Sequence, residues 1–345
     1  MAERNAGLVH VRTPTYKRPE ALKRALSSLI AQTWANWVCD VYDDDPDQSG
    51  RLALEALGDP RIRYTHNAPQ RFASKNIDQC FTAVNPHDAD YFCVVEDDNY
   101  ILPTFFEENI ALCRDNNIEI VLRNQLVEHA SGTDRAHLSE GGVLDHLFVE
   151  GLYRPEDFRQ SLLIGIGVSN GGLFWSRDAR SPLEIQFACT ATLQEYMRTF
   201  SICEPTYVAM TPLAVWAENA EQTTRNAELK SSYLRRELDL KRSVQTLQRI
   251  VWSQMPRERR RAFLANPLFA APAVDRARTL AKALVLPGLD GKLPLAEALR
   301  LRARGLAIRT LGRLTPDFER FVQSRLERIS HTPTGPAPTP QVARA

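Results

Sequence analysis

The sequence predicts an α/β protein with a mostly parallel sheet flanked by helices, followed by a C-terminal helical extension. Short apolar runs alternate with amphipathic helical stretches over roughly the first third of the chain, which is typical of parallel strands joined by right-handed crossovers. The clearest strand, Tyr91–Val95, is apolar throughout and ends abruptly in Glu96, Asp97 and Asp98. Because ligands bind outside the carboxyl ends of such strands, this acidic strand end is the first candidate site.

The N-terminal elements follow one another in regular order. Apolar residues at helical spacing indicate the helices, and short β-prone runs indicate the strands. Pro19 suits the first turn of the helix that it opens. The expected strands are 8–11, 37–42, 62–65, 91–95 and 119–122, and the expected helices are 19–32, 52–57, 74–84 and 103–116.

Beyond about Gln125 the alternation becomes less regular. Residues 129–160 are polar and contain glycines, which favours loops, whereas 162–175 is apolar and Gly-rich and is expected to form a strand and a turn. A long amphipathic helix is expected at 227–251, with further helices interrupted by prolines after it. The remaining expectations are a helix at 182–200, extended chain at 207–216 and a disordered Pro-rich tail at 332–345.

Composition and charge restrict the class of protein. A hydrophobic content of 43% and a charged content of 25% are ordinary for a soluble globular protein, and no run reaches the roughly 18 apolar residues that span a bilayer. The net charge of +1 conceals an uneven distribution, because residues 230–328 carry 22 Lys and Arg against 9 Asp and Glu. The N-terminus lacks an apolar signal core and the six cysteines form no CxxC pair, so a cytoplasmic protein with reduced thiols is expected.

The acids at the end of the fourth expected strand have a direct chemical interpretation. Three adjacent carboxylates repel one another and are costly to desolvate unless a cation lies among them. Their hard oxygens suit Mg²⁺ or Mn²⁺, and Mg²⁺ usually leaves several positions to water and substrate phosphates. Glu96–Asp98 therefore indicate a metal–diphosphate site, and a solvated acidic turn is the alternative.

Several separated motifs together resemble a family 2 glycosyltransferase with the GT-A (Rossmann-like) fold. They are PTYKRP at Pro14–Pro19, Gln32-Thr33, Asp43-Asp44, RFASKNID at Arg71–Asp78 and Glu96–Asp98, and the resemblance covers roughly residues 8–225. It implies an enzyme that moves a sugar from a nucleotide-diphosphate donor to an acceptor hydroxyl with inversion, assisted by Mn²⁺ or Mg²⁺. The family usually has Asp at the position of Glu96, and often at that of Asn99.

The resemblance also implies roles for individual residues. Tyr16 would flank a nucleobase, and Asp44 would accept a hydrogen bond from it, unless Asp44 caps a helix or turn. Arg18 and Lys75 would screen the diphosphate, unless they are solvated loop charges. The implied substrate-binding residues are Pro14, Thr15, Tyr16, Arg18, Asp44, Arg71, Lys75, Glu96 and Asp97, with Asp98 as the metal ligand.

A base must take the proton of the acceptor hydroxyl. In the resembled family it is a carboxylate in an acid pair before a helix that often ends in Arg, and the best local match is Gln194-Glu195-Tyr196 followed by Arg198. Glu195 is therefore the expected catalytic base, although Gln194 replaces the family's first acid and an ordinary solvated helix carboxylate is the alternative. Reserve candidates are Asp145, Glu150 and Asp157.

The basic residues 226–331 resemble no known family. They form either a helical appendage that contacts an anionic membrane face near a lipid-linked acceptor, a dock for a partner protein, or a solvated helical subdomain. Nucleic-acid binding is not expected, because the basic stretch lacks a recognisable motif and the body of the chain is acidic. The expected domains are a catalytic domain at 1–225, the basic extension at 226–331 and the tail at 332–345.

The expected biological role is bacterial-type surface polysaccharide or glycolipid synthesis with a carbohydrate or lipid-linked acceptor, at the inner face of the membrane. A sugar nucleotidyltransferase is a weaker alternative, because it would need a Gly-rich loop after the first strand. A non-catalytic nucleotide-sugar-binding scaffold is the other. The seven histidines show no HxxxH or HExxH spacing, and neither a GxSxG nor a Walker-type motif occurs.

Overall fold

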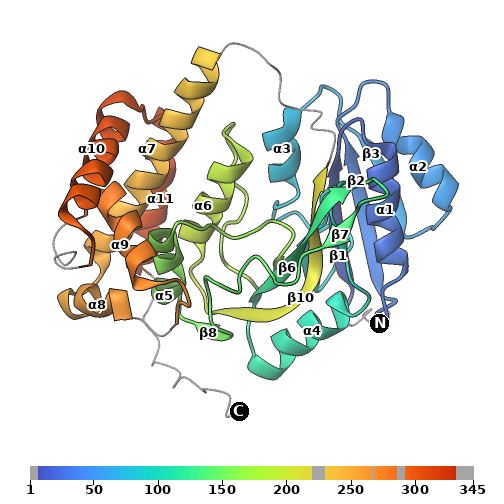
Figure 1. The fold of residues 1–345 in the computed structure, drawn as a ribbon. Helices are drawn as coiled ribbons and strands as arrows, with labels where there is room; N and C mark the ends of the chain where they lie inside the picture. Colours follow the sequence, from blue (N-terminus) through green and yellow to red (C-terminus); the bar gives the residue numbers. More distant parts are fainter. Residues whose placement is uncertain (1–6, 220–229, 266–267, 286–291, 332–345) are drawn as a thin grey trace.

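The computed structural model describes residues 7–219, 230–265, 268–285 and 292–331, and within them ten strands form one sheet with helices on both faces (Figure 1). The strand order in space is β3-β2-β1-β4-β9-β6-β10-β5, with β7 on β6 and β8 on β10. The expected α/β class is therefore confirmed.

The first half of the sheet is parallel, as the sequence predicts. It contains β1 (Val9–Thr15), β2 (Trp37–Asp43), β3 (Ile62–His66) and β4 (Tyr91–Val94). The first strand is longer than expected, because it includes Pro14 and Thr15 rather than ending at Val11. β4 pairs with β1 only as far as Arg12, so the missing N–H of Pro14 costs no bond on that side.

The second half of the sheet is mixed. β9 (Leu173–Ser176) lies antiparallel between β4 and β6 (Ile120–Ser131), and β6 is parallel to β10 (Thr206–Asn219). Three short strands, β5 (Tyr100–Ile101), β7 (His137–Leu138) and β8 (Gly151–Tyr153), are antiparallel to their partners. The expectation of a strand within 162–175 holds only from Leu173, because a 3₁₀ helix, η1 (Arg159–Ile164), comes first and ends at Gly165 with φ of 88°.

Two expected helices are shorter in the structure. The helix expected at 74–84 is α3 (Phe72–Gln79), because the carbonyls of Cys80, Thr82 and Val84 accept hydrogen bonds from Arg12 instead. The helix expected at 182–200 begins only at Ala191, where the Thr190 hydroxyl caps it. The helices of this part are α1 (Pro19–Ile30), α2 (Ser49–Leu57), α3, α4 (Phe105–Asn116), α5 (Pro155–Phe158) and α6 (Ala191–Ser201).

The C-terminal helices pack beside α5 and α6, on the side of the molecule away from α1 and α2 (Figure 1). They are α7 (Lys230–Gln254), α8 (Arg257–Ala262), the 3₁₀ helix η2 (Phe263–Ala265), α9 (Ala273–Lys282), α10 (Leu295–Leu311) and α11 (Pro316–His331). The first residues of the helix expected at 227–251, and the expected tail at 332–345, lie outside the described residues.

Two apolar clusters lie on opposite faces of the sheet. One packs α1 and α4 on the sheet, for example through Leu26 and Phe105. The other joins the sheet, α6 and the C-terminal helices, for example through Phe200, Trp252 and Phe318. The basic extension therefore completes the core on one face of the sheet. All six cysteines carry free thiols, and no described helix combines the length and apolarity needed to cross a membrane.

Candidate active site

The candidate site lies where β1, β2 and β4 end side by side. Thr15 and Asp43, the last residues of β1 and β2, are register partners. The chain after β4 stays beside β1, because the Val95 amide donates to the Arg12 carbonyl at 3.2 Å. The acids at 96–98 therefore share one edge of the sheet with the β1–α1 loop.

Asp97 is buried and anchors that loop. Its Oδ2 accepts hydrogen bonds from Thr15 Oγ1 at 2.9 Å and from the Tyr16 amide at 3.2 Å, and Arg18 lies 3.4 Å from its Oδ1. Burial, followed by the charge of Asp98, raises the pKa of Asp97, and Arg18 offsets part of that rise. The structure thus places Asp97 as a support for the loop that carries Tyr16, and its direct contact with substrate stays a prediction.

Asp98 is half-buried and more accessible than Asp97. Its carboxylate forms an ion pair with Arg18, and its backbone carbonyl accepts a hydrogen bond from Arg24 at 2.9 Å. Arg18 therefore bridges the two acids. Because Asp98 is the more accessible of the two carboxylates, it is better placed than the buried Asp97 to bind a ligand.

Glu96 is the acid whose neighbours are least favourable to its charge. Burial, then the charges of Asp98 and Glu195, raise the pKa of Glu96 to about 8. Two amides partly compensate, because Asn99 Nδ2 donates to Oε2 at 2.8 Å and Asn170 Nδ2 donates to Oε1 at 3.2 Å. Burial and the neighbouring carboxylates thus disfavour the charged form of Glu96, and a cation bound at this edge would favour it.

Glu195 comes to the same site from α6. Burial raises its pKa to about 7, against the opposing effects of Arg198 and the Asn170 amide. The segment before β9 approaches α6 closely, since a Cβ on Gly167 would lie 2.8 Å from the Glu195 carbonyl carbon. Asn170 therefore contacts both Glu96, through its side chain, and Glu195, through its backbone.

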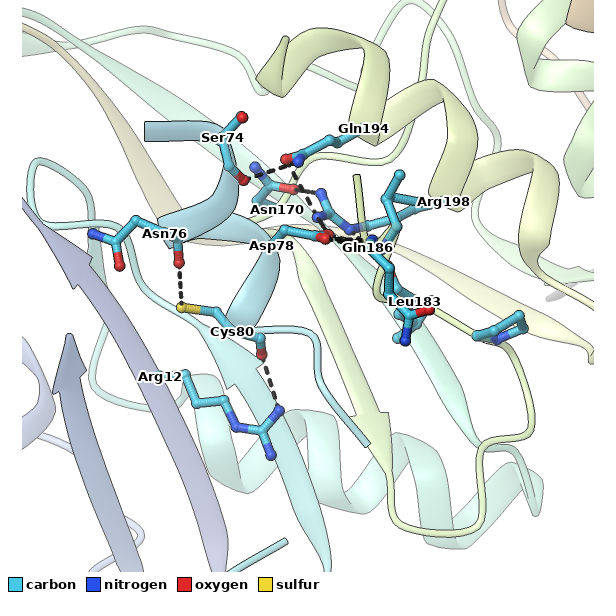
Figure 2. A network of polar contacts seen from close by, with 12 residues as sticks. Arg12, Ser74, Asn76, Asp78, Cys80, Asn170, Leu183, Gln186, Gln194 and Arg198 are labelled. Atoms are coloured by element: carbon cyan, nitrogen blue, oxygen red, sulfur yellow. Dashed lines mark hydrogen bonds and ion pairs between the residues drawn. The ribbon is translucent and has the colours of Figure 1, made fainter. Parts of the chain in front are cut away.

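A buried ion pair fixes α6 against α3 (Figure 2). Arg198 Nη2 lies 2.9 Å from Asp78 Oδ1, and Arg198 Nη1 donates to Asn170 Oδ1 at 2.8 Å. Asp78 also accepts from the Ile185 amide at 2.9 Å, and Gln194 Nε2 donates to the Ser74 carbonyl at 2.9 Å. The network sets the position of Glu195, one turn before Arg198 on the same helix.

Replacing Arg198 by Met should lower the free energy of unfolding by about 3–5 kcal/mol, because Asp78 would keep a buried charge without its cation. Urea denaturation measures the effect. The exposed Arg51→Met, which breaks a surface pair with Glu55, should cost at most about 1 kcal/mol. Equal stability of Arg198→Met and wild type would show that the pair does not hold the two helices together.

A cavity of about 740 Å³ lies beside the carboxyl ends of β2 and β3. Arg71 and Lys75, both exposed at the start of α3, line it together with Tyr42 and Asn67. Three of the lining residues also donate to the buried Asp44, whose carboxylate accepts from the Arg71 amide at 2.6 Å, the Phe72 amide at 2.7 Å and Asn67 Nδ2 at 3.1 Å. Asp44 is therefore a cap of α3, with about one acceptor position left for a ligand.

Comparisons with known proteins bear on the family and on the fold. Residues 11–174 match the family model described as glycosyl transferase family 2. This part of the chain is therefore similar in sequence to a family 2 glycosyltransferase domain. The match begins in β1 and ends in β9, so it contains Glu96–Asp98 but not Glu195.

Two curated relatives from Escherichia coli are glycosyltransferases. One is WcaA of strain K12, which is named for colanic acid biosynthesis. The two chains are 28% identical over 144 residues, and the aligned part is 41% of this chain and 46% of WcaA. The other is WfgD, which is named as a UDP-Glc:α-D-GlcNAc-diphosphoundecaprenol β-1,3-glucosyltransferase. The two chains are 26% identical over 117 residues, and the aligned part is 34% of this chain and 45% of WfgD. The chain thus spans less than half the length of either relative.

A solved structure shows the same fold. The crystal structure of S. aureus TarS 1-349 in complex with UDP-GlcNAc matches with a TM-score of 0.52 and 11% identity, over 92% of each chain. The fold of this chain is therefore the GT-A arrangement that the motifs predict.

The reserve base candidates have other partners in the structure. Glu150 accepts from Tyr207 at 3.2 Å and from the Met210 amide at 3.1 Å, and Asp145 accepts from Asn124 Nδ2 at 2.7 Å. Asp157 pairs with Arg154 and with Arg259 of α8, both at 2.8 Å.

Sequence reasoning did not identify Asn170 or Gly167 as site residues. Both lie in the irregular segment between η1 and β9, where no periodicity distinguishes one residue from the next. The four glycines in 165–172 are the sequence feature that could have indicated them, because such a density of glycines indicates that this backbone approaches another segment closely.

A second polar cluster lies away from this edge. Among the described residues, His10, Asp40 and His87 offer ligand atoms within 4.8 Å of one another. Asp40 Oδ2 lies 2.8 Å from Nε2 of each histidine, and Asp40 is the register partner of Arg12, three residues before the end of β1. With the Arg12 charge nearby and the Asp40 oxygen already accepting twice, we interpret the cluster as a hydrogen-bonded tie between β1, β2 and the loop before β4.

This cluster should make stability depend on pH. Burial lowers the pKa of His10, with the charge of Arg12 contributing, so the folded protein binds this proton less well than the unfolded chain. Its stabilising effect is present above the ordinary histidine pKa and is lost as the pH falls below it. From pH 7.5 to 5.5, wild type should lose about 1 kcal/mol more stability than His10→Gln in urea denaturation. Equal losses would show that His10 does not titrate in this range.

Proposed function

We propose that this chain moves a sugar from a nucleoside-diphosphate donor to an acceptor hydroxyl, with inversion at the anomeric carbon. The observation that carries the proposal is the position of Glu195, whose charge acts on Glu96 at the carboxyl edge of the sheet and whose own pKa is about 7. A carboxylate with that pKa beside this acidic edge suits general base catalysis near neutral pH.

The proposed reaction is a single displacement. Glu195 takes the proton of the acceptor hydroxyl while the oxygen attacks the anomeric carbon. The bond from that carbon to the diphosphate oxygen breaks, and the electron pair leaves with the nucleoside diphosphate. Attack opposite the leaving group inverts the anomeric configuration, so no covalent sugar–enzyme intermediate is needed.

The donor set at the acidic edge fits a divalent cation. The available ligands are hard carboxylate oxygens, and burial, followed by the charges of Asp98 and Glu195, raises the pKa of Glu96. Asp98 would hold the cation, and Glu96 would lie towards the ribose or a metal-bound water. When bound, Mn²⁺ or Mg²⁺ supplies neutralisation of the charge that develops on the departing diphosphate.

The cavity lined by Arg71 and Lys75 is the proposed place of the nucleotide. Its cations suit phosphate oxygens, and Asp44 retains about one acceptor position for a base N–H. Tyr16, which is exposed on the β1–α1 loop, would flank the base, with Pro14 and Thr15 shaping the loop and Arg18 contacting the diphosphate. Because WfgD is named for UDP-glucose and a diphosphoundecaprenol-linked acceptor, a UDP-sugar and a lipid-linked acceptor are the first substrates to test.

We further propose that residues 1–225 form the catalytic domain and 226–331 an appendage that stabilises it through their common core, ahead of a tail at 332–345. The proposed setting is surface polysaccharide or glycolipid synthesis at the cytoplasmic face of the membrane. Peripheral contact through the basic helices belongs to this proposal, and α10 is the element that would make it.

Release of nucleoside diphosphate from a panel of nucleotide sugars tests the function. Each donor is supplied with Mn²⁺, Mg²⁺ or EDTA, with and without lipid-extract acceptors, and donor binding is followed in parallel by thermal shift. Acceptor-dependent release that requires the cation supports the proposal. Donor binding with no release under any condition would favour the non-catalytic scaffold.

A further inference from the structure

Helix α10 packs on the rest of the molecule through a narrow face. Gly305 and Ile308 are its buried residues. A Cβ on Gly305 would lie 2.3 Å from the Lys282 carbonyl oxygen, and Gln245 Nε2 donates to both the Gly305 and Lys282 carbonyls at 2.9 Å. The close approach at glycine seats α10 against α7 and α9 without using its larger apolar side chains.

Those larger side chains face outward. Leu295, Leu299 and Leu306 are 76%, 56% and 55% exposed, and in an ideal helix they lie within about 40° of arc. The exposed residues Ala296, Ala303 and Ala307 widen this stripe on the side opposite Ile308. By contrast, Phe318, Phe321 and Val322 of α11 are buried, so α11 does not share this outward apolar face.

Arginines flank the stripe on both sides. At 3.6 residues per turn, Arg302 and Arg309 lie along one edge and Arg300 and Arg304 along the other. None of the four forms an ion pair with another residue that the structure describes. The single acid of the helix, Glu297, pairs with Arg278 at 2.7 Å. The helix therefore presents an apolar centre between two unneutralised cationic edges.

We propose that this outer face of α10, defined by Leu295, Leu299, Leu306 and the flanking arginines, binds the surface of an anionic lipid bilayer. Leucines enter the boundary between head groups and acyl chains, while guanidinium groups bind lipid phosphates at the same depth. α10 lies at the outer edge of the molecule, where a flat surface can reach it (Figure 1). The membrane contact would hold the enzyme beside a lipid-linked acceptor, and only this purpose rests on the proposed function.

A second copy of this chain fits the face less well. In a two-fold symmetric pair of α10 helices, each stripe would cover the other and the arginine rows would face arginine rows, because the same patch meets itself. Repulsion between four unpaired cations on each side opposes that arrangement. Lipid phosphates instead supply the complementary charge.

Co-sedimentation of the full chain with vesicles tests the proposal without measuring turnover. Wild type should bind vesicles containing phosphatidylglycerol, bind phosphatidylcholine vesicles weakly, and lose affinity as salt rises. Leu299→Glu/Leu306→Glu should reduce the partition coefficient at least tenfold, and Arg300→Gln/Arg304→Gln about fivefold or more. Leu52→Glu on α2, where the leucine is 70% exposed, is the matched control and should bind as wild type does.

Circular dichroism and sedimentation velocity complete the test. The variants should keep the wild-type helix content, because the altered side chains lie outside the core. Failure of wild type to bind anionic vesicles at low salt, or equal binding by the leucine variant, would overturn the proposal. The proposal would also be overturned if wild type is a dimer and Leu299→Glu/Leu306→Glu is a monomer, because this face of α10 would then bind a second copy of the chain.

Discussion

Glu195→Gln should reduce the rate of sugar transfer by about 10²–10⁴-fold while leaving donor binding close to wild type. The substitution removes the group that takes the acceptor proton but keeps the size of the side chain and leaves Asp98 untouched. Single-turnover kinetics with saturating donor and acceptor separate this chemical step from binding. Thermal shift with the donor alone should give the same response as wild type.

The pKa of Glu195 supplies an independent signature. Since the base must be deprotonated, kcat/KM of wild type should fall as the pH drops below about 7, and this limb should disappear in the residual activity of Glu195→Gln. The variant should be at least as stable as wild type, because burial opposes the carboxylate charge that the substitution removes. Glu55→Gln, an exposed carboxylate on α2, is the matched control. Full activity of Glu195→Gln would assign the base to another residue.

The first half of the fold could be predicted from the sequence because its helices and strands follow from the local pattern of apolar and polar residues. α1 begins at Pro19 and β4 occupies the apolar run before Glu96, as periodicity and composition predict. The second half depends on contacts between distant residues. β9 enters antiparallel between β4 and β6, and no local pattern in 162–175 distinguishes that pairing from a parallel one.

The site shows the same limit. The motif predicts three acids at one strand end, but it does not distinguish their surroundings. Asp97 is buried under the β1–α1 loop, whereas Asp98 reaches the rim and pairs with Arg18. Likewise, Asp44 matches the motif of a base-binding residue, yet its oxygens mainly accept backbone amides of α3. Side-chain burial decides between such alternatives, and burial is a property of the folded chain.

Asp98→Asn should weaken binding of Mn²⁺ and reduce cation-dependent transfer by roughly 10²-fold or more, because several kcal/mol of charge stabilisation depend on the cation. The amide keeps the shape of the side chain but loses the charge that attracts the metal. Isothermal titration with Mn²⁺ in the presence of nucleoside diphosphate measures binding, and diphosphate release measures transfer. Asp88→Asn, an exposed carboxylate paired with Arg177, should leave both unchanged.

Substitution of Arg18 provides a second test of the cation site, because it should change cation binding in the direction opposite to Asp98→Asn. Arg18 bridges Asp97 and Asp98, so it competes with a cation for the Asp98 carboxylate. Arg18→Gln should therefore bind Mn²⁺ more tightly than wild type in the absence of nucleotide, while it binds nucleoside diphosphate less tightly. Asp98→Asn should do the reverse for the metal. If Asp98→Asn binds Mn²⁺ as wild type does, the cation does not bind at Asp98. If Arg18→Gln weakens Mn²⁺ binding, Arg18 does not compete with the cation.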